Sequence, residues 1–223
     1  MRPAPPPADA LAADRARALA LTPVSRETAA RLDRFVELLL DRQRRINLVA
    51  PSTLPVLWTR HVADSLQLLD IAPATRVFVD IGSGGGFPGL PIACALAERA
   101  GAHVHLVESI AKKAAFLAEA VSVTGAPATV HATRFENIGD RLVPPPEMVL
   151  ARAVSPLKLL LDQSYPLLRR GAQALFPKGQ DVEAELTEAS KYWNITATLV
   201  PSRTDPRARI VHVQSLHPRG PAP

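Results

Sequence analysis

The sequence predicts an α/β fold with a mostly parallel seven-stranded sheet, one antiparallel hairpin strand and an N-terminal helical extension. From residue 76 onward, short apolar and β-branched runs alternate with helical runs, which is typical of a parallel sheet. The last two strand candidates follow each other directly, which predicts the antiparallel hairpin. The first strand candidate, Val77–Ile81, runs straight into the glycine-rich stretch Gly82–Gly89 and then into a helix. We therefore expect a ligand to bind at this turn.

The residues before the sheet divide into an extension and a helical segment. Residues 1–24 are rich in proline and alanine, so we expect disorder there, although Ala8–Leu21 has helical character. Residues 25–75 form the predicted helical segment, and residues 76–217 the predicted ligand-binding domain. In the helix expected over Ser25–Arg45, Ser25 acts as the cap together with Thr28, and the apolar stripe is Leu32, Phe35, Val36, Leu39 and Leu40.

Basic residues gather at the end of that helix and in the next one. Arg42, Arg44 and Arg45 either complement the helix dipole or contact phosphate, and the sequence does not separate these two interpretations. A second helix is expected over Thr53–Ile71. In it, Arg60 and Asp64 have the spacing of a solvated ion pair, and His61 has the surroundings of a hydrogen-bonded surface or interface histidine. The predicted core residues of this helix are Leu54, Leu57, Val62, Leu66 and Leu69.

The regular part of the chain follows in order. The predicted strands are Val77–Ile81, His103–Val107, Ala128–Ala132, Met148–Arg152, Ala172–Pro177, Ile195–Val200 and Ile210–Gln214. The predicted helices between them are Gly89–Arg99, Ala111–Val123, Pro156–Arg169 and Val182–Tyr192.

The glycine-rich turn allows two kinds of ligand. Its glycines at positions 84, 86 and 89 satisfy the dinucleotide fingerprint. Asp80, however, would repel a pyrophosphate and complement a ligand that carries an ammonium and a sulfonium, such as S-adenosylmethionine. Glu108 ends the second strand and has the position to accept hydrogen bonds from both ribose hydroxyls. The alternative is that Asp80 caps a turn and Glu108 is a surface carboxylate.

The length and composition of the chain exclude several other classes of protein. The 223 residues suit one α/β domain with an extension. The single cysteine, Cys94, excludes a disulfide framework and a cysteine-ligated metal cluster, and no apolar run reaches the roughly 18 residues of a membrane span. We expect a cytoplasmic monomer without a metal, and take His103 and His105 as core or rim histidines. The net charge of +5 is compatible with a nucleic-acid partner, but arginine and proline are equally enriched by a GC-rich genome.

Several ordered motifs between about Arg31 and Gly179 resemble one known family. The glycine-rich stretch Asp80–Gly89 is similar to the first motif of class I S-adenosylmethionine methyltransferases, which have a Rossmann-like fold. Together with the motifs below, it resembles the ribosomal RNA small subunit methyltransferase G family, also called glucose-inhibited division protein B. These further motifs are Asn47-Leu48, Arg60-His61-x-x-Asp64-Ser65, Val107-Glu108-Ser109-x-x-Lys112-Lys113-x-x-Phe116-Leu117, Arg134-Phe135-Glu136, Ala151-Arg152-Ala153 and Lys178-Gly179. The family usually has threonine at the position of Val49, and the resemblance weakens after Tyr192.

The resemblance implies methyl transfer from S-adenosylmethionine to N7 of a guanine in 16S ribosomal RNA, with the RNA or the small ribosomal subunit as partner. It implies that Gly82, Gly84 and Phe87 line the cofactor pocket, that Phe135 and Glu136 flank the adenine, and that Arg152 borders the methyl donor. Asp80 and Glu108 complete this expected site. The RNA contacts expected from the motifs are Arg60, His61, Arg134 and Lys178.

The sequence limits which base atom accepts the methyl group, and we assign no catalytic residue. Guanine N7 has a free lone pair and no proton, so its attack on the methyl group needs no general base. The Asn/Asp-Pro-Pro-aromatic motif of enzymes that methylate exocyclic amines is absent after the fourth strand, and Cys94 is in the wrong helix for a cytosine C5 enzyme. The competing classes are a nicotinamide oxidoreductase, a non-catalytic RNA-binding protein and a methyltransferase acting on a protein or small molecule.

Overall fold

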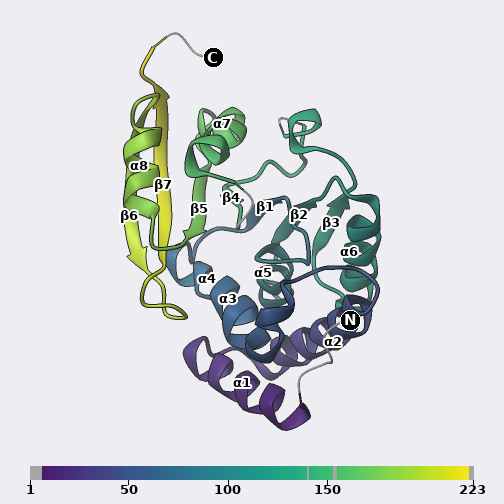
Figure 1. Ribbon diagram of the computed structural model, residues 1–223. Helices are drawn as coiled ribbons and strands as arrows, with labels where there is room; N and C mark the ends of the chain where they lie inside the picture. Colours follow the sequence, from purple (N-terminus) through teal and green to yellow (C-terminus); the bar gives the residue numbers. More distant parts are fainter. Residues whose placement is uncertain (1–6, 140, 153–154, 221–223) are drawn as a thin grey trace.

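The computed structural model describes residues 7–139, 141–152 and 155–220, and is built around one seven-stranded sheet (Figure 1). The strands lie in the order β3-β2-β1-β4-β5-β7-β6. Their bounds are β1 (Val77–Ile81), β2 (His103–Val107), β3 (Ala128–His131), β4 (Met148–Leu150), β5 (Gln173–Lys178), β6 (Trp193–Pro201) and β7 (Arg209–Pro218). Strand β7 is antiparallel to both neighbours, whereas β1 to β5 pair in parallel. The predicted fold class is thus confirmed.

Helices cover both faces of this sheet because side chains alternate along each strand. Phe78 of β1 packs in one core with Phe35 and Leu106, and Val79 packs in the opposite core with Phe176 and Leu161. The helices are α1 (Ala8–Leu21), α2 (Arg26–Gln43), α5 (Gly89–Ala95), α6 (Ala111–Thr124), α7 (Leu157–Leu168) and α8 (Val182–Ala189). The first four supply the core on the Phe78 side, and α7 and α8 supply the other. The sheet is therefore the middle of three layers.

The N-terminal part packs onto the same core as the sheet. The Oγ of Ser25 accepts from the backbone N–H of Thr28 at 3.1 Å, which confirms the predicted cap of α2. The helical character predicted for Ala8–Leu21 within residues 1–24 is confirmed, because these residues form α1. This helix is held to α2 by two hydrogen bonds from Arg15 to Asp33. The expected disorder of residues 1–6 and the motif residue Ala153 lie outside the described residues, and the division at residue 76 stays a prediction.

The helix predicted over Thr53–Ile71 is instead a series of short turns. It comprises a 3-10 helix η1 (Pro51–Val56), one stretch of π-helix η2 (Trp58–Ala63), α3 (Asp64–Leu66) and α4 (Leu68–Ile71). The physical reason lies in Asp14 of α1, whose Oδ2 accepts from the backbone N–H groups of Trp58 and Thr59 at 2.8 and 3.2 Å. A helix start capped by a remote carboxylate cannot be recognised from local periodicity. No helix in the described ranges is both long and apolar enough to cross a membrane.

Candidate active site

A cavity of about 810 Å³ opens at the carboxyl ends of the parallel strands. This is the edge at which open α/β sheets bind ligands. The cavity is lined by the glycine-rich turn after β1, by the end of β2, by η2, by the residues after β4 and β5, and by the loop between β6 and β7. Of the residues expected to form the site, it brings together Gly82, Gly84, Phe87, Glu108, Arg152, Arg60, His61 and Lys178.

The glycine-rich turn forms one wall, and its shape requires residues without a Cβ. Gly82, Gly84 and Gly86 have φ values of 71°, 55° and 94°, which residues other than glycine rarely adopt. A Cβ at Gly85 would lie 2.7 Å from the carbonyl oxygen of Leu48, so the loop after α2 rests directly on the turn. The turn is thus fixed between β1 and the N-terminal segment.

Glu108 connects the turn to the end of β2. Its Oε2 accepts from the N–H of Gly84 at 2.9 Å, and its Oε1 accepts from the N–H of Ile110 at 2.7 Å. The side chain is buried and lines the cavity. The surface-carboxylate alternative therefore does not describe Glu108. The carboxylate organises the turn, and its expected contact with a ribose stays a prediction.

Asp80 lies beneath the cavity and does not line it. Its Oδ2 accepts from the N–H of Gly89 at 3.0 Å, as the turn-cap alternative requires. Its Oδ1 is buried and has no hydrogen-bond partner among the described residues. Burial raises the pKa of Asp80 to about 7, against the lowering effect of the Gly89 hydrogen bond. The carboxyl group thus keeps one uncommitted acceptor next to the glycine-rich turn.

Arg152 follows β4 and occupies the centre of a buried polar cluster. Its guanidinium lies over the Phe87 ring, 5.2 Å from the centroid. It donates to the Nδ1 of His61 at 2.5 Å and to the carbonyl oxygen of Arg60 at 3.1 Å. It also lies 3.5 Å from the Oδ2 of Asp64. Burial lowers the pKa of Arg152, and the carboxylate of Asp64 opposes this effect.

His61 is a buried histidine that joins η1 to Arg152. Because its Nδ1 accepts from Arg152, its Nε2 donates to the Oγ1 of Thr53, at 2.8 Å. Burial lowers the pKa of His61 to about 2, and the charges of Arg152 and Arg60 add to the effect. The imidazole is therefore neutral at physiological pH. The predicted solvated pair between Arg60 and Asp64 is wrong, because Asp64 turns inward to Arg152 and Arg60 lies 3.8 Å from Asp205.

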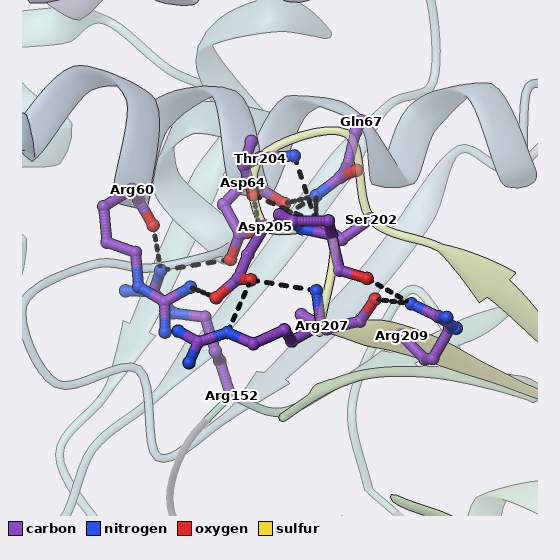
Figure 2. Close-up of polar contacts among 11 residues, drawn as sticks. Arg60, Asp64, Gln67, Arg152, Ser202, Thr204, Asp205, Arg207 and Arg209 are labelled. Carbon is purple, nitrogen blue, oxygen red and sulfur yellow. Dashed lines mark hydrogen bonds and ion pairs between the residues drawn. The ribbon is translucent and has the colours of Figure 1, made fainter. Parts of the chain in front are cut away.

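The loop between β6 and β7 is the part of the site that the sequence did not reveal. Thr204 donates to the Oδ1 of Asp64 at 2.6 Å, and the N–H of Arg203 donates to the Oε1 of Gln67 at 2.9 Å. Figure 2 shows Asp205 next to Arg60, and Thr204 and Ser202 next to Asp64 and Gln67. The only signal in the sequence is the polar run Ser202-Arg203-Thr204-Asp205 between the two strands of the predicted hairpin.

The remaining predicted site residues lie at the edge of the cavity or outside it. Lys178 lines it and donates to the carbonyl of Ser155 at 3.0 Å, with Glu185 at 2.7 Å. Arg134 is exposed and does not line the cavity. Phe135 is packed in the core beside α7, and Glu136 is exposed and accepts from Gln163. The structure therefore does not bring these last three residues into the cavity wall.

No group of three or more His, Cys, Asp and Glu side chains suitable for a metal ion occurs in the described part of the chain. His105 and His131 share a hydrogen bond of 3.1 Å, and burial lowers the pKa of His105 to about 4. Cys94 is buried in α5, where burial raises the pKa of its thiol to about 12. The thiol is thus protonated and inert at neutral pH.

Solved structures show the same fold at low sequence identity. An O-methyltransferase from Bacillus cereus in complex with SAH aligns over 91% of this chain and 97% of its own, with a TM-score of 0.58 and 14% identity. A putative O-methyltransferase from Klebsiella pneumoniae aligns over 92% of this chain and 96% of its own, with a TM-score of 0.56 and 14% identity. At this identity the likeness concerns the fold alone.

Sequence relatives are far more similar. A protein from Bradyrhizobium sp. strain BTAi1 named ribosomal RNA small subunit methyltransferase G is 61% identical over 92% of this chain and 93% of its own length. One of the same name from Rhodopseudomonas palustris strain BisB18 is 55% identical over 96% of this chain and 92% of its own. The family model described as rRNA small subunit methyltransferase G matches residues 28–209. This chain therefore belongs to the rRNA small subunit methyltransferase G family.

Proposed function

We propose that this protein transfers a methyl group from S-adenosylmethionine to N7 of one guanine in 16S ribosomal RNA. The observation that carries the proposal is the cavity between the glycine-rich turn, Glu108 and Arg152, in a chain that belongs to this family. The names of the similar proteins support ribosomal RNA as the substrate. The choice of N7 rests on the motif resemblance and on the cavity chemistry.

The residues of the cavity fit the methyl donor. S-adenosylmethionine carries a sulfonium, an ammonium and a ribose, and it supplies an activated methyl group. Gly82 and Gly84 leave the main chain open to a ligand, and Glu108 is an acceptor at the end of β2. The unpartnered Oδ1 of Asp80 suits a donor on a cationic ligand. We assign Gly82, Gly84, Phe87, Glu108 and Arg152 to the cavity wall of this site, with Asp80 beneath it.

Phe135 and Glu136 are assigned on weaker grounds. Their proposed place beside the adenine rests on the resemblance alone, because Phe135 is packed in the core and Glu136 points to Gln163. A change in Glu136 alone is therefore a useful test of that assignment. Under this proposal, Glu136→Gln weakens cofactor binding although its side chain is exposed.

The cavity contains no group that has to act as a base. The lone pair of guanine N7 is free, so the protein needs to hold donor and acceptor in line and tolerate the positive charge on the methylated base. Positioning of this kind contributes up to about 7 to 11 kcal/mol to a barrier in favourable cases. His61 is neutral because its pKa is lowered to about 2, and it orients Arg152 through its Nδ1.

Four residues are proposed to contact RNA. Arg60 is half-exposed at the cavity wall and suits a phosphate contact. Arg134 is exposed outside the cavity, whereas His61 and Lys178 are largely buried by their present partners. If replacing Arg60 and Lys178 with alanine leaves both RNA affinity and its salt dependence unchanged, this role is wrong. We further propose that the protein acts in the cytoplasm as a monomer.

The decisive experiment locates the methylated atom. The protein and S-adenosylmethionine are incubated with small ribosomal subunits, and separately with purified 16S RNA, from a strain that lacks the gene. Borohydride and aniline cleave RNA at N7-methylguanine, and primer extension locates the break. One new protein-dependent stop supports the proposal and identifies the preferred form of the substrate. No stop, with cofactor binding confirmed by calorimetry, moves the acceptor to another atom or to a protein or small molecule.

A variant in the glycine-rich turn tests whether methylation depends on the cavity. Gly82→Trp places an indole in the glycine-rich turn at a positive φ, so we expect cofactor binding and methylation to be lost together. Retained cofactor affinity in calorimetry would contradict the assignment of the pocket. Gly171→Trp is the matched control for general damage, because Gly171 also has a positive φ of 96°, lies outside the cavity wall, and a Cβ there meets nothing within 4 Å.

A further inference from the structure

Asp64 and Arg152 form a buried ion pair in the wall of the cavity. The side chain of Asp64 is 7% exposed and that of Arg152 is 14% exposed, and the two lie 3.5 Å apart. Charges this deeply buried destabilise a protein unless a partner offsets them. The position of the Asp64 carboxylate therefore decides how much of the Arg152 charge acts inside the cavity.

The other contacts of Arg152 leave this charge uncompensated. The carbonyl oxygen of Arg60 and the Nδ1 of His61 are neutral acceptors, and the Phe87 ring is uncharged. His61 stays neutral at physiological pH because burial lowers its pKa to about 2. Among the described residues in contact with the guanidinium, Asp64 alone carries a negative charge.

Asp64 is itself held by the tip of the hairpin between β6 and β7. Its Oδ1 accepts from Thr204 at 2.6 Å and from the Nε2 of Gln67 at 2.9 Å, which leaves Oδ2 facing Arg152. Gln67 is in turn fixed by the N–H of Arg203 at 2.9 Å and lies 3.3 Å from the Oγ of Ser202 (Figure 2). The hairpin tip thereby sets the orientation of the carboxylate at the first residue of α3.

We infer that Asp64 is a positioning residue that offsets the charge of Arg152, so that the cavity accepts a cationic methyl donor as readily as its neutral product. Thr204 and Gln67 keep its carboxylate in that role. The inference rests on the proposed function. S-adenosylmethionine carries a positive sulfonium, whereas S-adenosylhomocysteine has a neutral thioether and lacks the methyl group. The change in the ratio of the two affinities between a variant and the unmodified protein therefore reports how the substitution acts on the methylated sulfonium.

The test measures both affinities by calorimetry on the full chain. Asp64→Asn keeps the shape of the side chain and removes its charge. We expect it to weaken S-adenosylmethionine binding by about tenfold, and S-adenosylhomocysteine binding by less than about threefold, because the ammonium and carboxylate are common to both ligands and only the sulfonium charge differs. Thr204→Val is expected to shift the same ratio in the same direction by a smaller factor, since Gln67 still holds Asp64.

Asp41→Asn is the matched control. Asp41 pairs with Arg42 on the surface of α2, away from the hairpin and outside the cavity wall, so neither affinity should change. Equal weakening of both ligands in Asp64→Asn and Thr204→Val would overturn the inference and assign Asp64 a purely structural role. An unchanged ratio in Thr204→Val overturns it even if Asp64→Asn does not fold. If the unmodified protein binds neither ligand, the proposed function itself fails.

Discussion

The backbone N–H of Gly89 donates to the buried carboxylate of Asp80 at 3.0 Å, and nothing larger than glycine fits at this contact. A Cβ at Gly89 would lie 2.8 Å from the Oδ2 of Asp80 and 2.5 Å from a methyl group of Leu106. The start of α5 is thus pressed against β1 and β2. This contact explains why the glycine-rich turn ends in glycine at position 89.

Gly89→Ala is expected to destabilise the protein by about 1 to 3 kcal/mol, the usual cost of an added methyl group in a packed core. Urea unfolding of the variant measures this difference. Gly179→Ala is the control, because its Cβ would meet nothing within 4 Å. Equal stabilities of the two variants would show that α5 moves away from Asp80 at little cost.

Asp80→Asn is expected to change how stability depends on pH. Burial raises the pKa of Asp80 from 3.8 to about 7, so its contribution is fully present below about pH 4 and is lost as the pH rises through 7. The asparagine keeps an acceptor for Gly89 and has no charge to bury. Relative to the unmodified protein, the variant should gain about 2 to 4 kcal/mol between pH 4 and pH 8. If the free energy of unfolding of the two proteins changes with pH in the same way, the pKa of Asp80 is not raised.

Asp14→Ala is expected to loosen η2. The carboxylate accepts from the N–H groups of Trp58 and Thr59 and from the hydroxyl of Thr59, so the variant leaves buried donors without partners. We expect a loss of about 2 kcal/mol in unfolding free energy, together with faster hydrogen exchange at Trp58 and Thr59. Asp9→Ala, an exposed change in the first turn of α1, is the control. Unchanged exchange at Trp58 would refute the capping role.

Gln43→Leu is expected to weaken both ligand binding and stability. The amide of Gln43 accepts from the N–H groups of Leu48 and Val49 and donates to the carbonyl of Val49, at 2.8 to 3.0 Å. This clamp holds the loop that rests on Gly85 and lines the cavity. We expect an affinity for S-adenosylmethionine lower by about tenfold, with about 1 to 2 kcal/mol lost in stability. Gln163→Leu, which breaks the exposed hydrogen bond to Glu136, supplies the comparison.

The sequence identified the elements whose signal is local. Strands β1 and β2 have the predicted bounds, because a run of apolar residues followed by glycine or an acidic residue is visible within a few positions. The cap of α2 at Ser25 is equally local. The structure also brings Glu108 and Arg152, which belong to the motifs, into the cavity wall.

What the sequence could not show depends on contacts between distant residues. Asp80 faces α5 because its side chain shares a face of β1 with Phe78, and only the packed helix reveals which partner it meets. Asp64 turns to Arg152 and Thr204, which lie 88 and 140 positions further along the chain. Its spacing from Arg60 therefore predicted the wrong ion pair. Helix α1 packs on the core through Leu11, Ala18 and Leu19, and the contacts of its Arg15 with Asp33 and of its Asp14 with Thr59 add to this packing.

Asp14 and Thr204 lie 204 − 14 = 190 positions apart, yet both support the short segment that holds His61 and Asp64. During synthesis this segment therefore leaves the ribosome long before Thr204 has been added to the chain. From Asp64 to Arg209 the chain has 209 − 63 = 146 residues, which take roughly 7 to 30 seconds to translate. Chains interrupted before the hairpin leave Asp64 without its Thr204 contact. We therefore expect the polar cluster around Asp64 and Arg152 to be completed only after the hairpin has been synthesised.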